Sequence, residues 1–102
     1  MINMRTYEPV DEDTWSMDYS LAIFLDKAFT KFIECSQAHP TELTEQEWDA
    51  ILKEIRDGFR TYRRYKDWDW SLKGEEIAWE EVENQLIRSF YLMGKYYSGL
   101  WW

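Results

Sequence analysis

Three long amphipathic segments make up most of the chain, separated by stretches without a hydrophobic period. The first segment covers about residues 16–37, where apolar side chains recur at steps of three and four. This spacing places them on one face of a helix. They are Met17, Leu21, Phe24, Leu25, Ala28, Phe29, Phe32 and Ile33. Residues 1–12 lack this period, so we expect an extended arm there.

The second segment has the clearest starting signal. Thr44 and Glu47 match the T-x-x-E capping box, in which each side chain satisfies a backbone amide of the other residue. The pattern predicts a helix over about 45–66, with Gly58 inside its apolar stripe. Glycine costs a helix interior about 1 kcal/mol relative to alanine. We therefore expect a neighbouring helix to approach the backbone closely at Gly58.

The third segment follows an interruption at residues 67–74, DWDWSLKG, which predicts a loop. We expect a helix over about 75–98, with Gly99 as a left-handed stop. Helices joined by short loops favour antiparallel neighbours. The chain is therefore predicted to be one all-α domain over 1–102, a three-helix up-down-up bundle. The apolar stripes could also be completed by dimerisation, so we expect a homo-oligomer.

Composition limits the possible partners. Twenty acidic residues face twelve basic ones, for a net charge of -8. This balance argues against binding duplex nucleic acid or an anionic membrane. It permits a basic partner, including a nucleic-acid-binding protein whose site an acidic surface blocks. No apolar run has the length of a membrane span, so we expect a cytoplasmic protein.

The sequence carries no recognisable catalytic motif. The one histidine, His39, stands beside Pro40 in a turn, and the four glycines do not form a phosphate loop. Cys35 has no cationic neighbour in sequence that would activate its thiol. Carboxylates occur on all three helices, but metal-binding bundles usually add histidines from the same helices. We expect a non-enzymatic protein without a metal or cofactor.

Positive charge and aromatic rings are concentrated in residues 59–70, FRTYRRYKDWDW. Guanidinium groups bind phosphates in a forked geometry, and aromatic rings stack on bases. This combination predicts a site for a nucleotide-type small molecule. Its candidate residues are Arg60, Arg63, Arg64, Lys66, Tyr65, Trp68 and Trp70.

An internal role for the same arginines remains open. If the second and third helices are antiparallel, the end of one lies beside the start of the other. The arginines would then pair with Glu75, Glu76, Glu80 and Glu83. A protein-binding role is also open, with an acidic face that includes Glu75, Glu76, Glu80 and Glu81.

Three blocks of sequence resemble a widespread family of small tailed-phage and prophage proteins. They are DTWSMDYSLA at 13–22, HPTELTEQEWDAIL at 39–52 and FYLMGKYYSGLWW at 90–102. The blocks keep the family's order and cover most of the chain. The chain departs from the family pattern at Met17, where leucine is commoner, and at Gln46, where glutamate is commoner. The resemblance implies a phage origin and a helical fold, and supplies no catalytic residues.

A phage origin implies the cytoplasm of a host bacterium and favours a counter-defence function. One expectation is that the arginine and aromatic cluster sequesters a nucleotide messenger of host immunity. The alternative is an acidic inhibitor that binds and occludes a host defence protein such as a CRISPR effector, in the manner of an anti-CRISPR protein. A further alternative is a small accessory protein of phage replication or assembly.

Overall fold

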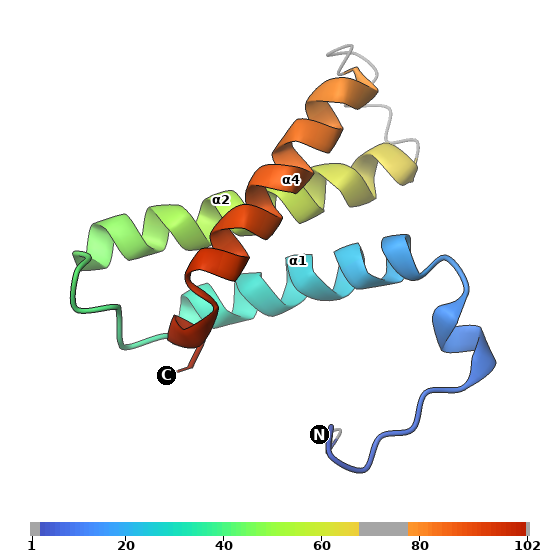
Figure 1. Ribbon diagram of the computed structural model, residues 1–102, viewed down its shortest axis with the longest axis horizontal. Coiled ribbons are helices and arrows are strands. Elements are labelled where there is room, and N and C mark those ends of the chain that lie inside the picture. Colours follow the sequence, from blue (N-terminus) through green and yellow to red (C-terminus); the bar gives the residue numbers. More distant parts are fainter. Residues whose placement is uncertain (1–2, 68–77, 102) are drawn as a thin grey trace.

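The computed structural model describes residues 3–67 and 78–101, which form an all-α protein (Figure 1). Neither described range contains a strand. The expected three-helix bundle is confirmed. Its main helices are α1 (Met17–Cys35), α2 (Glu45–Lys66) and α4 (Trp79–Lys95). Two short 3-10 helices flank them, η1 (Asp11–Thr14) and η2 (Tyr97–Gly99).

The central helix of the bundle is α2. α1 runs antiparallel along one flank of α2, and α4 crosses α2 diagonally (Figure 1). Both outer helices make their main contacts with α2, and their own backbones approach each other at few points at most. The C-terminal end of α4 lies nearest to α1, and its N-terminal end points away (Figure 1). The bundle is therefore open between α1 and α4.

The bounds of α2 agree with the sequence prediction. The Thr44 hydroxyl accepts from the Glu47 amide at 3.1 Å, and the Glu47 carboxylate accepts from the Thr44 amide at 2.9 Å. These bonds satisfy amides that the first helical turn leaves unpaired, and they hold the pKa of Glu47 below its usual range. Arg63, Arg64 and Lys66 in the last turn complement the negative end of the helix dipole.

The other helix ends differ from the prediction. α1 stops at Cys35 because Ser36 turns to an extended conformation, two residues before the expected end. α4 ends at Lys95 and gives way to η2, and the expected start of this helix at residue 75 lies outside the described residues. Gly99 does not have a positive φ, so its prediction as a left-handed stop is wrong. The expected arm also runs into η1, which begins at Asp11.

Two clusters of buried side chains form the core. The larger joins α1, α2 and α4 through Phe29, Trp48, Leu52, Ile55, Phe59 and Leu92. The smaller consists of Ala22, Tyr62 and Val82. Each large apolar side chain contributes about 1.5–3 kcal/mol when fully buried. Because α2 supplies most of these side chains, it fixes where the outer helices pack.

The backbones of α2 and α4 lie close together at Gly58. A Cβ atom built at Gly58 would lie 1.8 Å from Oγ of Ser89 and 2.7 Å from the carbonyl oxygen of Gln85. Both distances are far below van der Waals contact. The expectation that a neighbouring helix passes close to this glycine is confirmed.

The apolar stripe predicted for the first helix is only partly buried. Leu21 and Phe24 are 43% and 61% exposed, whereas Asp26 is 2% exposed. The buried face of α1 is therefore rotated toward Ala22, Asp26 and Phe29. This rotation follows from the open arrangement, since α4 does not cover the flank of α1 that carries Leu21 and Phe24.

Candidate functional site

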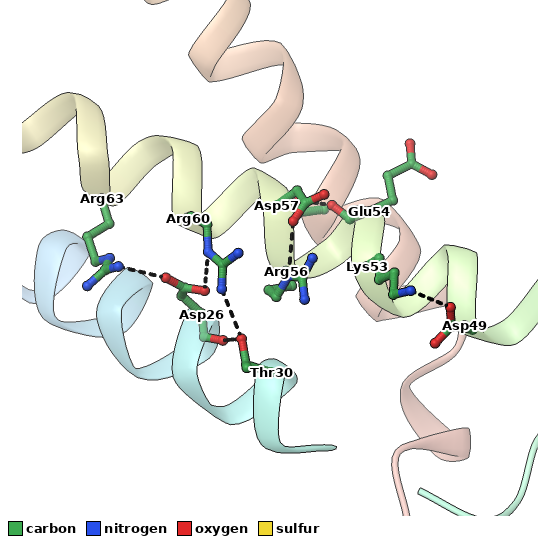
Figure 2. Close-up of polar contacts among 10 residues, drawn as sticks. Asp26, Thr30, Asp49, Lys53, Glu54, Arg56, Asp57, Arg60 and Arg63 are labelled. Carbon is green, nitrogen blue, oxygen red and sulfur yellow. Dashed lines mark hydrogen bonds and ion pairs between the residues drawn. The ribbon is translucent and has the colours of Figure 1, made fainter. Parts of the chain in front are cut away.

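Two of the candidate arginines converge on one buried carboxylate of α1 (Figure 2). Oδ1 of Asp26 lies 3.0 Å from Nε of Arg60, and Oδ2 lies 3.1 Å from Nη2 of Arg63. Nη2 of Arg60 also donates to Oγ1 of Thr30 at 3.2 Å. Asp26 thus holds both guanidinium groups against α1 and fixes their orientation.

For Arg60 and Arg63, the interpretation that the arginines pair with Glu80 and Glu83 of the third helix is wrong. In the described part of the chain, their ion pairs are with Asp26 on α1. Gly58 faces α4, and a helix turns by about 200° over two residues. Arg60 is therefore directed away from α4. Glu75 and Glu76 lie outside the described residues.

The cluster predicted from residues 59–70 is divided between two sides of α2. Tyr65 lies on the α4 side, where its partner is Trp79, and Lys66 contacts both Trp79 of α4 and Asp18 of α1. The ring centroids of Tyr65 and Trp79 are 5.5 Å apart, and Nζ of Lys66 lies 5.6 Å from the centroid of Trp79. The structure therefore does not bring Tyr65 beside Arg60 and Arg63. Trp68 and Trp70 lie outside the described residues, and Arg64 is half-buried in the last turn of α2.

An open pocket of about 270 Å³ adjoins the two arginines on the α1 side. We call it the basic pocket. It is lined by Asp26, Lys27, Thr30, Lys31, Glu34, Arg60 and Arg63. Four cations thus face two carboxylates, although the whole chain carries a charge of -8.

The arginines keep donors for a ligand at this pocket. A guanidinium group has five N–H donors, and Asp26 and Thr30 accept one bond each from Arg60. Arg63 binds Asp26 through Nη2, while its Nε is buried without a hydrogen-bond partner among the described residues and is not accessible to a ligand. Lys27 makes no ion pair within residues 3–67 and 78–101. Chemically, the pocket can bind an anion such as a phosphate group.

Sequence reasoning missed Asp26, Lys27 and Lys31. A signal for Asp26 was present, because it stands between Ala22 and Phe29 at helical spacing, on the stripe that α1 buries. A carboxylate in such a position requires a cationic partner. Lys27 and Lys31 are exposed and four residues apart. Their proximity to the arginines depends on how α1 and α2 align.

A second polar contact between α1 and α2 involves Tyr62, whose hydroxyl donates to Oδ2 of Asp18. This bond is the main reason that the pKa of Asp18 is held below its usual range. Burial, together with the Asp18 carboxylate, raises the pKa of Tyr62 to about 12. The neutral tyrosine is therefore the form that the fold favours.

Stability is expected to fall in alkali because of Tyr62. Its ordinary pKa is 10.0, so the contribution of the neutral phenol is complete below pH 10 and is lost as pH rises through about 12. Two pKa units correspond to about 2–3 kcal/mol. Urea unfolding should show that, as pH rises through about 12, the wild type loses this amount of unfolding free energy relative to Tyr62→Phe. Parallel loss in both proteins would exclude the Tyr62 titration as the cause.

The predicted acidic face is described only in part. Glu80 and Glu81 are exposed in the first turn of α4, while Glu75 and Glu76 lie outside the described residues. Exposed carboxylates at a helix start also complement the dipole. The position of Glu80 and Glu81 is compatible with either a protein contact or a purely local role.

The remaining candidate chemistry is sparse. Nδ1 of His39 lies 2.9 Å from the carbonyl oxygen of Pro40, within the loop between α1 and α2. In residues 3–67 and 78–101, no three histidine, cysteine, aspartate or glutamate side chains gather in a way that could hold a metal ion. None of the helices described here combines the length and the apolar character needed to cross a membrane.

Comparison of the chain with protein-family models, with curated proteins and with solved structures finds no match. The functional argument therefore depends on the chemistry of the chain itself.

Proposed function

We propose that the chain is a non-enzymatic phage binding protein that sequesters a nucleotide-type ligand in counter-defence. The phosphate of the ligand would occupy the basic pocket between α1 and α2. The observation that carries this proposal is the excess of positive charge at that pocket in a strongly acidic chain. The phage setting has a separate support, the resemblance of the three sequence blocks.

Preorganisation supports an anionic ligand at this position. Asp26 is buried and takes one guanidinium edge from each arginine. Their side chains are then held in place before a ligand arrives, which reduces the entropy that binding must overcome. Lys27 and Lys31 are exposed and can close on a phosphate from the α1 side, Lys31 by exchanging its exposed ion pair with Glu34 for the phosphate. Their charge adds to that of the arginines.

Because the predicted cluster is divided between two sides of α2, we expect the basic pocket to recognise the phosphate of a ligand and not its base. Tyr65 packs with Trp79 on the α4 side of α2, so it is not a stacking platform for a base held at the basic pocket. Among the described residues, the pocket lining includes no aromatic side chain. Phosphate contacts should therefore dominate the affinity, and binding should weaken as salt is added.

Removing the two pocket lysines is expected to weaken nucleotide binding. Isothermal titration calorimetry would use pyrophosphate, linear nucleotides and cyclic dinucleotides as ligands. The double variant Lys27→Ala and Lys31→Ala should lose about tenfold or more in affinity, because hydrogen bonds to charged groups contribute about 1.5–3 kcal/mol each. Both lysines are exposed, so the variant should keep its fold.

A matched control removes the same charge elsewhere. Lys53 forms an exposed ion pair with Asp49, and Lys95 is exposed at the end of α4. The double variant Lys53→Ala and Lys95→Ala should bind like the wild type. Equal losses in the two variants would indicate a general charge effect and contradict a site at the basic pocket. Recovery of altered nucleotide after incubation would contradict the non-enzymatic assignment.

Occlusion of a host defence protein is the second candidate function. It is favoured by the large apolar side chains that α1 and α4 leave exposed. Such side chains often mark protein interfaces. If no nucleotide binds and the protein inhibits a purified CRISPR effector nuclease, the results support occlusion of a defence protein and contradict nucleotide sequestration.

A further inference from the structure

The basic pocket has an excess of two positive charges. Four of its lining side chains are cationic and two are carboxylates. This excess is local, because the whole chain has a net charge of -8. A phosphate monoester has a charge of about −1.5 to −2 at pH 7, whereas each phosphodiester group has a charge of about −1. The charge of the pocket therefore matches a monoester.

The contacts inside the pocket identify which charges are left for a ligand. Arg60 and Arg63 share the single carboxylate of Asp26, so one guanidinium charge is not compensated there. In the part of the chain that the structure describes, Lys27 makes no ion pair. Lys31 pairs with Glu34 at 3.7 Å, and both side chains are mostly exposed, so this pair contributes little. One guanidinium group and one ammonium group thus remain for the ligand.

Hydrogen-bond donors at the pocket also suit a terminal phosphate. Arg60 has five N–H donors, of which Asp26 and Thr30 take one each, so three remain. Each lysine ammonium group adds donors of its own. A phosphate monoester has three strong acceptor oxygens. A phosphodiester has lost one of these to its second ester bond, and it therefore accepts fewer of the available hydrogen bonds.

The size of the pocket limits it to one end of a ligand. Its volume of about 270 Å³ is below the range of about 300–1,000 Å³ that is usual for sites enclosing a whole small molecule. No aromatic side chain of the described residues lines it, so a base would find no stacking partner there. The nucleoside would extend into solvent. A phosphate at the end of a ligand can enter such a pocket without bringing a second substituent with it.

We propose that the basic pocket binds phosphate monoesters in preference to phosphodiesters. This inference rests on the proposed function, in which a nucleotide-type ligand places its phosphate at the pocket. It restricts the ligand class to linear nucleotides that end in a phosphate group. Cyclic dinucleotides, in which both phosphates are diesters, should bind weakly or not at all.

Calorimetric titration with a matched pair of adenine nucleotides tests this preference. The pair consists of adenosine 5′-monophosphate and adenosine 3′,5′-cyclic monophosphate, which share the base and the sugar and differ in one ester bond. At about pH 7.5 and constant ionic strength, the wild type should bind the linear nucleotide at least about tenfold more tightly. One further hydrogen bond between charged groups accounts for a factor of this size.

The same titrations at about pH 5 test whether charge causes the preference. The second pKa of a phosphate monoester is about 6, so the linear nucleotide has lost most of its second charge at pH 5, whereas the cyclic nucleotide keeps its charge. Histidine, the side chain that ordinarily titrates in this interval, is absent from the described lining. The affinity for the linear nucleotide should therefore fall about tenfold, with little change for the cyclic one. The charged groups that face the ligand are Asp26, Lys27, Lys31 and Glu34 on α1, and Arg60 and Arg63 on α2.

The double variant Lys27→Ala and Lys31→Ala separates this inference from the proposed function. It should lose more affinity for the linear nucleotide than for the cyclic one, so the preference should shrink. If the wild type binds the cyclic nucleotide as tightly as the linear one, and the variant binds neither, the preference is overturned and the nucleotide site remains. A preference that does not change between pH 7.5 and pH 5 would also overturn the inference. If the wild type binds neither nucleotide, or binds both no better than the variant does, the inference and the proposed function both fail.

Discussion

Replacing Gly58 by alanine is expected to lower the free energy of unfolding by about 2–3 kcal/mol. The added methyl group would lie 1.8 Å from Oγ of Ser89 and 2.7 Å from the carbonyl oxygen of Gln85. The Ser89 side chain can rotate, but the Gln85 oxygen belongs to the backbone of α4 and moves only with the helix. Alanine also favours the helix by about 1 kcal/mol. The variant is less stable than the wild type only if the steric penalty exceeds that gain. The sign of the change in unfolding free energy therefore tests whether α2 and α4 are in close contact at Gly58.

Gly94 is the natural control for this experiment. It lies in α4, and a Cβ atom added there would have no neighbour within 4 Å. Gly94→Ala should therefore stabilise the protein by up to about 1 kcal/mol. Urea unfolding of the two variants should show opposite signs. Stabilisation by Gly58→Ala would contradict the close approach of α2 and α4. Adding Ser89→Ala to Gly58→Ala should recover only part of the loss, because the Gln85 oxygen remains.

Replacing Asp26 by alanine is expected to cost about 2–4 kcal/mol of stability. Removing one partner of a buried ion pair usually costs about 3–5 kcal/mol, because it leaves the other charge buried and unpaired. Here the side chains of Arg60 and Arg63 are 38% and 29% exposed, so water can replace part of the lost interaction. The expected effect is reduced accordingly. Thermal or urea unfolding would measure it.

The appropriate comparison is an aspartate in an exposed pair. Asp49 accepts from Lys53 at 2.8 Å, and both side chains are about half exposed. Asp49→Ala should cost about 0.5 kcal/mol or less. Equal losses for Asp26→Ala and Asp49→Ala would mean that the buried network adds no stability. Mutation of Arg60 should also cost less in the Asp26→Ala protein than in the wild type, since the two groups act together.

The parts of the fold that depend on local sequence were predictable. The capping box of Thr44 and Glu47 acts within one turn, and the observed helix begins at Glu45 as expected. The close approach at Gly58 was also predictable, because only packing explains a glycine in an apolar stripe. The end of α1 at Cys35 was harder to predict from the sequence, since Ser36 leaves the helix without a proline or glycine beside it.

The exposed flank of α1 depends on the crossing of α4, which no local pattern encodes. Leu21 and Phe24 have the same spacing as buried residues, and their exposure follows from where α4 lies. The pairing of Arg60 and Arg63 with Glu80 and Glu83, one of the two interpretations of the cluster, was wrong for a related reason. Antiparallel order placed their helix end beside the third helix, but the rotation of α2 directs Arg60 and Arg63 toward α1. Such rotations are set by packing across helices.

The polar contacts between α1 and α2 specify a single alignment of this helix pair. These contacts recur along α1, and in each of them an acidic group on one side pairs with a donor on the other. Each acidic group therefore has its donor only when the two helices are in this alignment. Sliding α1 by one helical turn, about 5.4 Å, would leave a buried carboxylate and two guanidinium groups mismatched. Apolar side chains alone would tolerate such a slip more easily. The contacts that lock this register are Asp18 with Tyr62, Tyr19 with Asp67, and Asp26 with Arg60 and Arg63.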